Sequence, residues 1–520
     1  MPLNTTCRDR LLKIIDSNFK TEIQYYTHPK VQTTAHAVGT VDAENWTQLL
    51  HEEKIIPSLP TKGDRFVEIE RTLTAFYCLL LQDSALNDAY DAFSAAQKNN
   101  PELKETDVIT ENNFKALQDR TRSIINSDSD KHAVLMYLII YSDLGKSPRL
   151  KELLSALAND NNVEIDLSLD PDDLMAAILK KFTDEQIGEL LPSYLKLSLN
   201  AKEMLKRIYP IMQACFGHLY FLERGERTLQ IIAAALKNII SPKQRKEALD
   251  IVYLAQLYDG IGAQGQKKIT GSVTCTNHFS QGYDLIYSCL GHLLTSSSKQ
   301  AFDYYLHERA KWLGLDQPLL SREQQVIIRL ACMLRGFTPD FGAILIDEFK
   351  KLNLLHQELL IEQFGFNGEG IECWTKVNYI ATVPQNLSRE LFANNQIQQA
   401  VAHALNGTIC FAMLVKEMTS RFPEIVIDET RAISFGEIAF LATQHPELFD
   451  PNKFNAAKYA IDPKQNKIVQ SVLSNNHLAK TALMTGVGLA GLYVIGCLFF
   501  KKAGAPSPAD SVNTLKNFSL

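Results

Sequence analysis

The sequence lacks any C-x-x-C pair of cysteines. The 520 residues include nine cysteines, an odd number scattered along the chain. Disulfide-stapled domains and structural zinc sites both need paired, suitably spaced cysteines, so this pattern disfavours both. We therefore expect reduced, mostly buried thiols and a body that lies in a cytosol.

A basic surface and the signatures of several enzyme classes are also missing. The net charge is −6, whereas sequence-independent binding of nucleic acid needs a basic face, so no nucleic-acid partner is expected. The chain has no P-loop, nucleophile elbow or H-E-x-x-H motif. The segment from Cys7 to Tyr26 is charged and amphipathic and lacks the apolar core of a secretory signal.

The distribution of apolar residues predicts an all-α body. Phe66, Ile69, Leu73 and Phe76 follow one another at helical spacing, and we expect helices at about 8–26, 65–96, 114–125, 132–141 and 229–236. The segment 371–383 is the best candidate for extended structure, and a pair of short strands there would leave the class unchanged. We therefore predict a multi-helix globular body.

One long uncharged segment lies near the carboxyl end. Thr481 to Phe500 is 20 residues without a charge, preceded by Lys480 and followed by Lys501-Lys502. At a rise of about 1.5 Å per residue, such a helix crosses the hydrocarbon layer of a bilayer. We predict a single C-terminal transmembrane helix with the lipid bilayer as partner. Small residues recur on one face of it, which would also suit a homodimer, although such residues are common in membrane spans; they are Ala482, Gly486 and Ala490.

A series of polar residues runs through the apolar helical segments between Cys215 and Phe337. His218 is followed by Tyr258-Asp259, in the context Leu-Tyr-Asp-Gly-Ile-Gly, and then by His278. This order resembles the HD superfamily of metal-dependent phosphohydrolases. In that helical fold a histidine, a His-Asp doublet and a distant aspartate converge on one or two metal ions.

The resemblance implies a metal site and a chemistry. His218, Asp259 and His278 would bind a divalent transition metal, and Asp259 and Arg224 would take part in catalysis. Three protein ligands with one open position suit a hydrolytic zinc ion, which lowers the pKa of its bound water. Arg224 and Lys267-Lys268 would hold the phosphate oxygens.

The sequence also departs from the pattern of that family. Tyr258 replaces the doublet histidine, and Cys332 stands where the last aspartate aligns; neutral tyrosine is a poor metal ligand. Asp259-Gly260 is equally typical of a helix C-terminus, and a lone histidine such as His218 is equally typical of a packed core. Asp143-Leu144-Gly145-Lys146 repeats the Asp-x-Gly pattern without a histidine at a matching distance, and we interpret it as structural.

These observations leave two functions open. The preferred one is a membrane-anchored binding or interaction protein with a degenerate HD-like core and no turnover. The alternative is a metal-dependent phosphohydrolase acting on a nucleotide or another phosphoester. The polar tail also resembles the C-terminal signals of effectors secreted by type IV systems of intracellular bacteria, which would place the anchor in a host membrane.

The expected organisation of the chain has six parts. Two helical regions precede the HD-like core, and a polar stalk connects that core to the membrane segment and the tail. The boundaries are 1–110 and 111–210 for the helical regions, 211–462 for the core, 463–479 for the stalk, 480–502 for the transmembrane helix and 503–520 for the tail.

Overall fold

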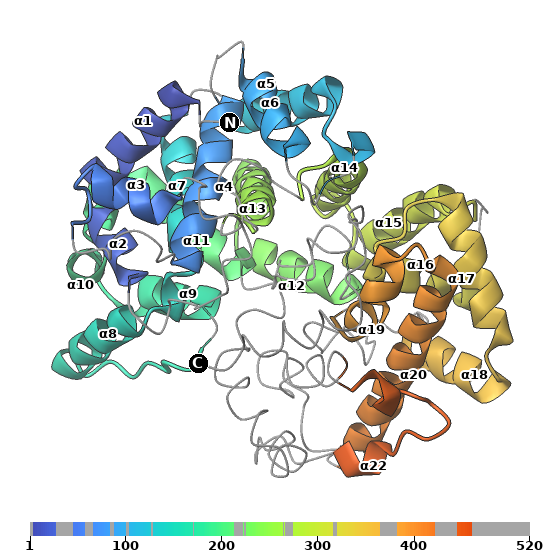
Figure 1. Ribbon diagram of the computed structural model, residues 1–520. Helices are drawn as coiled ribbons and strands as arrows, with labels where there is room; N and C mark the ends of the chain where they lie inside the picture. The colour runs from blue at the N-terminus through green and yellow to red at the C-terminus, as the bar shows by residue number, and fades with distance from the viewer. Residues whose placement is uncertain are drawn as a thin grey trace, which may run out of the picture.

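The computed structural model is all-helical, with no strand among the residues that it describes (Figure 1). This confirms the predicted all-α class. The described residues are 4–27, 45–57, 66–83, 88–99, 103, 105–125, 128–169, 171–212, 222, 225–263, 265, 274–315, 320–364, 382–421, 442 and 445–459.

The amino-terminal half and one later helix, α13, form a first group of helices (Figure 1). The α-helices of this group are α1 (Thr5–Ile14), α2 (Lys20–Tyr25), α3 (Trp46–Glu52), α4 (Val67–Asp83), α5 (Ala89–Lys98), α6 (Glu111–Ile125), α7 (Ser129–Tyr141), α8 (Pro148–Asp160), α9 (Pro171–Lys181), α10 (Asp184–Leu190), α11 (Leu199–Met212) and α13 (Pro242–Gly262). A π-helical turn, η1 (Ile15–Phe19), joins α1 to α2, and the 3-10 turns are η2 (Glu105–Asp107), η3 (Leu144–Lys146) and η4 (Pro192–Lys196).

A second group of helices follows in the carboxyl-terminal half. It contains α15 (Ser298–Trp312), α16 (Arg322–Met333), α17 (Pro339–Lys351), α18 (Leu354–Phe364), α19 (Thr382–Ala393), α20 (Ile397–Arg421), η7 (Pro446–Leu448) and α22 (Ala456–Tyr459). Two helices contact both groups and connect them, α12 (Glu226–Lys237) and α14 (Asn277–His292).

Local sequence explains where many of these helices begin. Ser147-Pro148, Ser241-Pro242 and Thr338-Pro339 each place a capping hydroxyl directly before a proline at the first helical position. The hydroxyl accepts a hydrogen bond from a backbone N–H that has no partner inside the helix, and the proline lacks an N–H that would need one. These starts are therefore encoded in a few consecutive residues.

The sequence-based helix boundaries are partly correct. The helix expected at 65–96 is two helices, α4 and α5, and the helix expected at 8–26 contains the π turn η1. The helix that carries Asp259 does not end at Gly260 but continues to Gly262. The segment 371–381 and the predicted transmembrane segment Thr481–Phe500 lie outside the described residues. Among the helices that are described, none is both long enough and apolar enough to cross a membrane.

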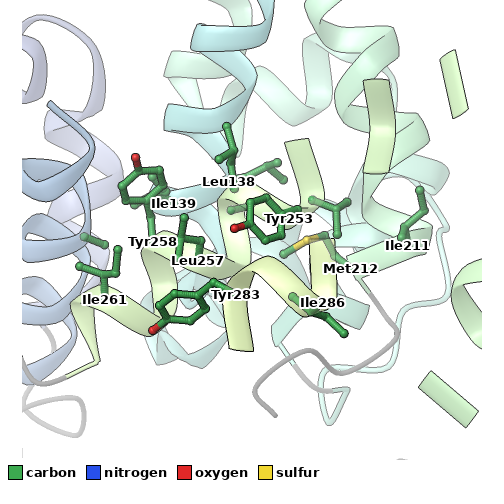
Figure 2. Packing of buried hydrophobic residues seen from close by; sticks show 14 of the residues in the cluster. Leu138, Ile139, Ile211, Met212, Tyr253, Leu257, Tyr258, Ile261, Tyr283 and Ile286 are labelled. Atoms are coloured by element: carbon green, nitrogen blue, oxygen red, sulfur yellow. The ribbon is translucent and has the colours of Figure 1, made fainter. Parts of the chain in front are cut away.

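Helix α13 lies at the centre of the first group. Its second half is buried on nearly every side, because α4, α7, α11 and α14 all pack against it. Figure 2 shows this core, in which Tyr253, Leu257, Tyr258 and Ile261 of α13 lie among apolar side chains of the other helices. Burial of these side chains is the main favourable contribution to folding here.

Buried tyrosines fix the positions of the helices more specifically than the aliphatic residues do. The hydroxyl of Tyr26 donates to the carbonyl of Ile140 at 2.7 Å, and that of Tyr283 donates to Thr274 at 2.7 Å. A buried hydroxyl without a partner destabilises the fold, so such bonds favour a single arrangement.

The contact between α13 and α4 depends on a glycine. A Cβ atom added at Gly262 would lie 2.5 Å from the carbonyl oxygen of Arg71 and 2.7 Å from the Cβ of Ala75. These distances are too short for non-bonded atoms, so only glycine permits this approach of the two helices.

We predict that Gly262→Ala lowers the free energy of unfolding by about 1–3 kcal/mol, because the extra methyl group overpacks the contact between α13 and α4. Gly291→Ala in α14 is the matched control, because a Cβ there meets no atom within 4 Å. It is expected to stabilise by about 0.5–1 kcal/mol. Urea unfolding of both variants measures the difference, and equal effects at the two positions would contradict the packing argument.

Candidate functional site

Six charged side chains from four segments gather where α4 and α13 meet the start of α9. We call them the charge cluster. Four are acids and two are bases, namely Glu68 and Arg71 of α4, Asp143 and Lys146 at η3, Asp172 of α9 and Asp259 of α13.

Arg71 is the centre of this cluster. Its Nη1 lies 2.9 Å from Glu68 Oε2 and 3.5 Å from Asp143 Oδ2. Its Nη2 lies 4.0 Å from Asp259 Oδ1. The Arg71 side chain is only 6% exposed, so one nearly buried guanidinium faces carboxylates from three segments of the chain.

Lys146 supplies the second positive charge. Its Nζ lies 2.7 Å from Asp143 Oδ1 and 3.2 Å from Glu68 Oε1. Glu68 and Asp143 therefore each contact both cations, one through each carboxylate oxygen. Their side chains are 12% and 16% exposed, whereas Lys146 is 36% and Asp259 is 39% exposed. The cluster is thus buried at Arg71 and reaches solvent at Lys146 and Asp259.

Two glycines bring the segments of the cluster together. Gly262 lets α13 approach the backbone of Arg71, which places Asp259 one helical turn earlier opposite the guanidinium. A Cβ at Gly145 would lie 2.6 Å from the Cα of Pro171, the first residue of α9. The turn that carries Asp143 and Lys146 is therefore held against the helix start that carries Asp172.

The environment separates the pKa values of the four acids. Burial acts to raise the pKa of Asp143, but Lys146 and Arg71 outweigh it, and that pKa lies well below its usual range. Burial and the charge of Asp143 raise the pKa of Glu68 despite the same two cations. Two carboxylates so close together in a partly dry site do not both ionise easily.

The remaining two acids are less well compensated. Burial raises the pKa of Asp259, and Arg71 offsets this only in part. Burial, followed by the charges of Asp143 and Asp259, raises the pKa of Asp172 well above its ordinary value. The surroundings thus lower the pKa of Asp143 and raise the pKa of each of the other three acids.

Three buried polar atoms in this region have no hydrogen-bond partner among the residues that the structure describes. They are Oδ1 of Asp172, Nε of Arg71 and the hydroxyl of Tyr209. Tyr209 is 1% exposed, and the carboxylate of Asp172 contributes to raising its pKa. Buried polar atoms without partners are uncommon in folded proteins, and each costs stability.

Of the residues predicted from sequence, Asp259 lies in this cluster. Its neighbour Tyr258 faces another side of α13, where its hydroxyl contacts Thr121 at 2.9 Å and donates to Gln82 at 3.0 Å. The Tyr258 hydroxyl is therefore hydrogen-bonded within the core. Cys332 of α16 is also buried, with its sulfur 3.9 Å from the hydroxyl of Tyr305.

The other predicted residues are placed only in part. His218, Arg224 and Lys267-Lys268 lie outside the described residues, and of His278 only the backbone, in the first turn of α14, is described. The described residues contain no group of three or more His, Cys, Asp or Glu that could hold a metal ion. The ligand set of His218, Asp259 and His278 remains a prediction.

The sequence analysis missed most of the cluster. It interpreted Asp143-Leu144-Gly145-Lys146 as structural, yet this segment supplies an acid and a base opposite Asp259. The repetition of Asp-x-Gly at two places was a usable signal. A second signal was the presence of Glu68 and Arg71 in a helix that is otherwise largely apolar.

Comparison with known families was informative in one respect. A profile described as a family of unknown function (DUF6829) matches residues 12–176 and 230–430, which is well over half of the chain. The chain belongs to DUF6829. Both matched segments of this DUF6829 chain contribute to the charge cluster, since the first includes Arg71 and Asp143 and the second includes Asp259. No curated protein and no solved structure matches the chain.

We predict that Asp172→Asn becomes more stable relative to the wild type as pH rises. Above about pH 4 the unfolded chain releases the Asp172 proton, whereas the folded chain retains it because its pKa is raised. Wild-type stability therefore falls with pH relative to a variant that cannot ionise at this position.

Urea unfolding at pH 5 and pH 8 measures this effect, and unfolding at about pH 3 and at pH 5 measures the control, whose carboxyl titrates below pH 4. Asp130→Asn is a control of opposite sign, because hydrogen bonds from Asn200 and Ser198 lower the pKa of Asp130. That wild-type carboxylate gains stability relative to its variant as pH rises through the acid range. A pH-independent difference for Asp172→Asn would show that this carboxyl titrates alike in the folded and unfolded chains.

Proposed function

We propose that the chain is a binding protein without turnover, in which the guanidinium of Arg71 occupies the place that a metal ion holds in an HD-type enzyme. The observation that carries this proposal is the position of Arg71 within 4.0 Å of carboxylates from both η3 and α13. The HD-like frame itself is part of the proposal.

In this proposal the HD-like doublet lies at residues 142–143 and no longer at Tyr258-Asp259. Ser142-Asp143, followed by Gly145, matches the His-Asp-x-Gly context with serine in place of the histidine, and Asp259 then corresponds to the distant aspartate. This alignment is supported by the proximity of both acids to Arg71. The resemblance implies that the doublet and the distant aspartate lie close together in space. In the Tyr258-Asp259 alignment the doublet would include Tyr258, whose hydroxyl is already hydrogen-bonded in the core.

Electrostatics argues against a metal beside Arg71. Two unit charges 4 Å apart repel by about 4 kcal/mol at an effective dielectric constant of 20, and a divalent ion doubles that figure. The oxygens of Asp143 also already contact Lys146 and Arg71. If Arg71 keeps a metal away, no metal-bound hydroxide would form here to act as the nucleophile of a metal-dependent phosphohydrolase.

Metal analysis of the purified full-length chain tests this function. We predict that the wild type, prepared without chelator, contains only substoichiometric transition metal and does not hydrolyse bis(p-nitrophenyl) phosphate with added zinc or manganese. Asp143→Asn and Asp259→Ala should leave the metal content unchanged.

The opposite result would identify the hydrolase. Near-stoichiometric metal in the wild type that is lost in Asp259→Ala but retained in Asp160→Asn, a change at an exposed position of α8, would sink the binding proposal. The metal-dependent phosphohydrolase, with its ligands His218, Asp259 and His278, would then be the better account.

The proposed site of action is a membrane surface. The support is the uncharged segment Thr481–Phe500 with its basic flanks, which would hold the helical body on the cytosolic side of a bilayer, or at a host membrane if the protein is secreted.

We predict that the full chain resists extraction from membranes by alkaline carbonate. Leu489→Arg combined with Ile495→Arg should release it, because an arginine near the centre of a span costs about 2.5–3.5 kcal/mol. Leu489→Ile is the conservative control. Release of the wild-type chain by carbonate would refute the anchor.

A further inference from the structure

We infer that the charge cluster binds a small organic cation, a primary ammonium or guanidinium group, between Asp172 and Asp259. This inference rests on the proposed binding function and names the class of ligand that the site would accept. It follows from the balance of charge, the unpartnered buried atoms and the exposure of the cluster.

The charges of the cluster are not balanced from within. Four carboxyl groups share two cations, and both cations are engaged by Glu68 and Asp143 at 2.7 to 3.5 Å. Asp259 has only the longer contact to Arg71 at 4.0 Å. In the part of the chain that the structure describes, Asp172 forms no ion pair. A further positive charge between Asp172 and Asp259 would stabilise the ionised form of both groups, so that the ligand binds as the Asp172 proton is released.

The unpartnered atoms indicate what kind of cation fits. Among the described residues, Oδ1 of Asp172 is a buried acceptor without a donor, and the buried hydroxyl of Tyr209, which can both donate and accept, has no partner. The two groups are close enough to influence each other electrostatically. A ligand with several N–H donors satisfies both, whereas a cation without N–H groups satisfies neither. A charge-assisted hydrogen bond to a carboxylate is among the stronger ones available.

The same geometry is less suitable for a metal ion. The described residues offer no set of three metal-binding side chains. Arg71 repels any cation, but it repels a monovalent ammonium or guanidinium group half as strongly as a divalent ion at the same distance.

The cluster reaches solvent at Asp259. The exposed fraction rises from 6% for Arg71 to 39% for Asp259. A cation in solvent therefore has access to Asp259, and Oδ1 of Asp172 is buried. Desolvation at Asp172 strengthens the final ion pair.

Thermal unfolding of the full-length protein with added cations tests the inference. The probes are methylguanidinium and methylammonium chloride, and the controls at equal ionic strength are sodium chloride and tetramethylammonium chloride, which has no N–H group. We predict a dose-dependent rise of Tm with at least one probe and none with the controls, because only a ligand of the folded state stabilises it.

The variants locate the binding site. Asp172→Asn is expected to weaken binding about tenfold or more through loss of a charge-assisted bond, and Tyr209→Phe about threefold to tenfold through loss of one hydroxyl. Tyr209→Phe retains the packing of the ring, so it still tests the binding site if Asp172→Asn does not fold. Asp160→Asn at an exposed position should bind as the wild type does.

Three results would overturn the inference: equal shifts with tetramethylammonium, unchanged binding in both Asp172→Asn and Tyr209→Phe, or stabilisation by magnesium or manganese but by neither organic probe. The metal content described above is measured on the same preparations. If the wild type lacks metal and its Tm does not rise with either organic cation, the proposed ligand class is wrong but the proposed binding function is not contradicted. If it contains stoichiometric metal, the binding function itself falls.

Discussion

The close packing of α13 on α4 is the constraint on which both the hydrophobic core and the charge cluster depend. A single position without a side chain, Gly262, allows the two helices to approach until a Cβ would overlap the backbone of Arg71. The contact buries Leu257 and Tyr258 on one side of α13 and sets Asp259 against the guanidinium on another. Core and site are thus consequences of the same helix pair.

The charge cluster costs more free energy than is usual for a group of residues with a purely structural role. Nearly buried ion pairs are often no more stable than apolar residues of the same volume, because desolvation cancels much of the attraction. Asp172 and Tyr209 also leave buried atoms without partners, although the rest of the core satisfies its tyrosine hydroxyls well, as at Tyr26 and Tyr283. An arrangement with this cost is typical of a site whose shape and charge serve a ligand.

Much of the fold could be predicted from local pattern, and much of the site could not. The starts of α8 and α13 are each encoded by two adjacent residues, Ser147-Pro148 and Ser241-Pro242. The apolar spacing from Phe66 onward predicts the body of α4. Asp259 was predicted as a site residue from its Tyr-Asp-Gly context. Its partners Arg71 and Asp143 lie far away in the sequence, and no local rule connects them because their association depends on how three helices pack.

The sequence by itself determined the helical class, the helix starts and the presence of acids in apolar surroundings, because these depend on neighbouring residues. Only the tertiary structure decided which charges meet. Sequence spacing predicts a metal beside Asp259, which stays a prediction, and it gave no sign that packing brings the guanidinium of Arg71 within 4.0 Å of that carboxylate. The interaction of charges depends on distance in space and on burial, and both are set by contacts between segments that the chain order does not reveal.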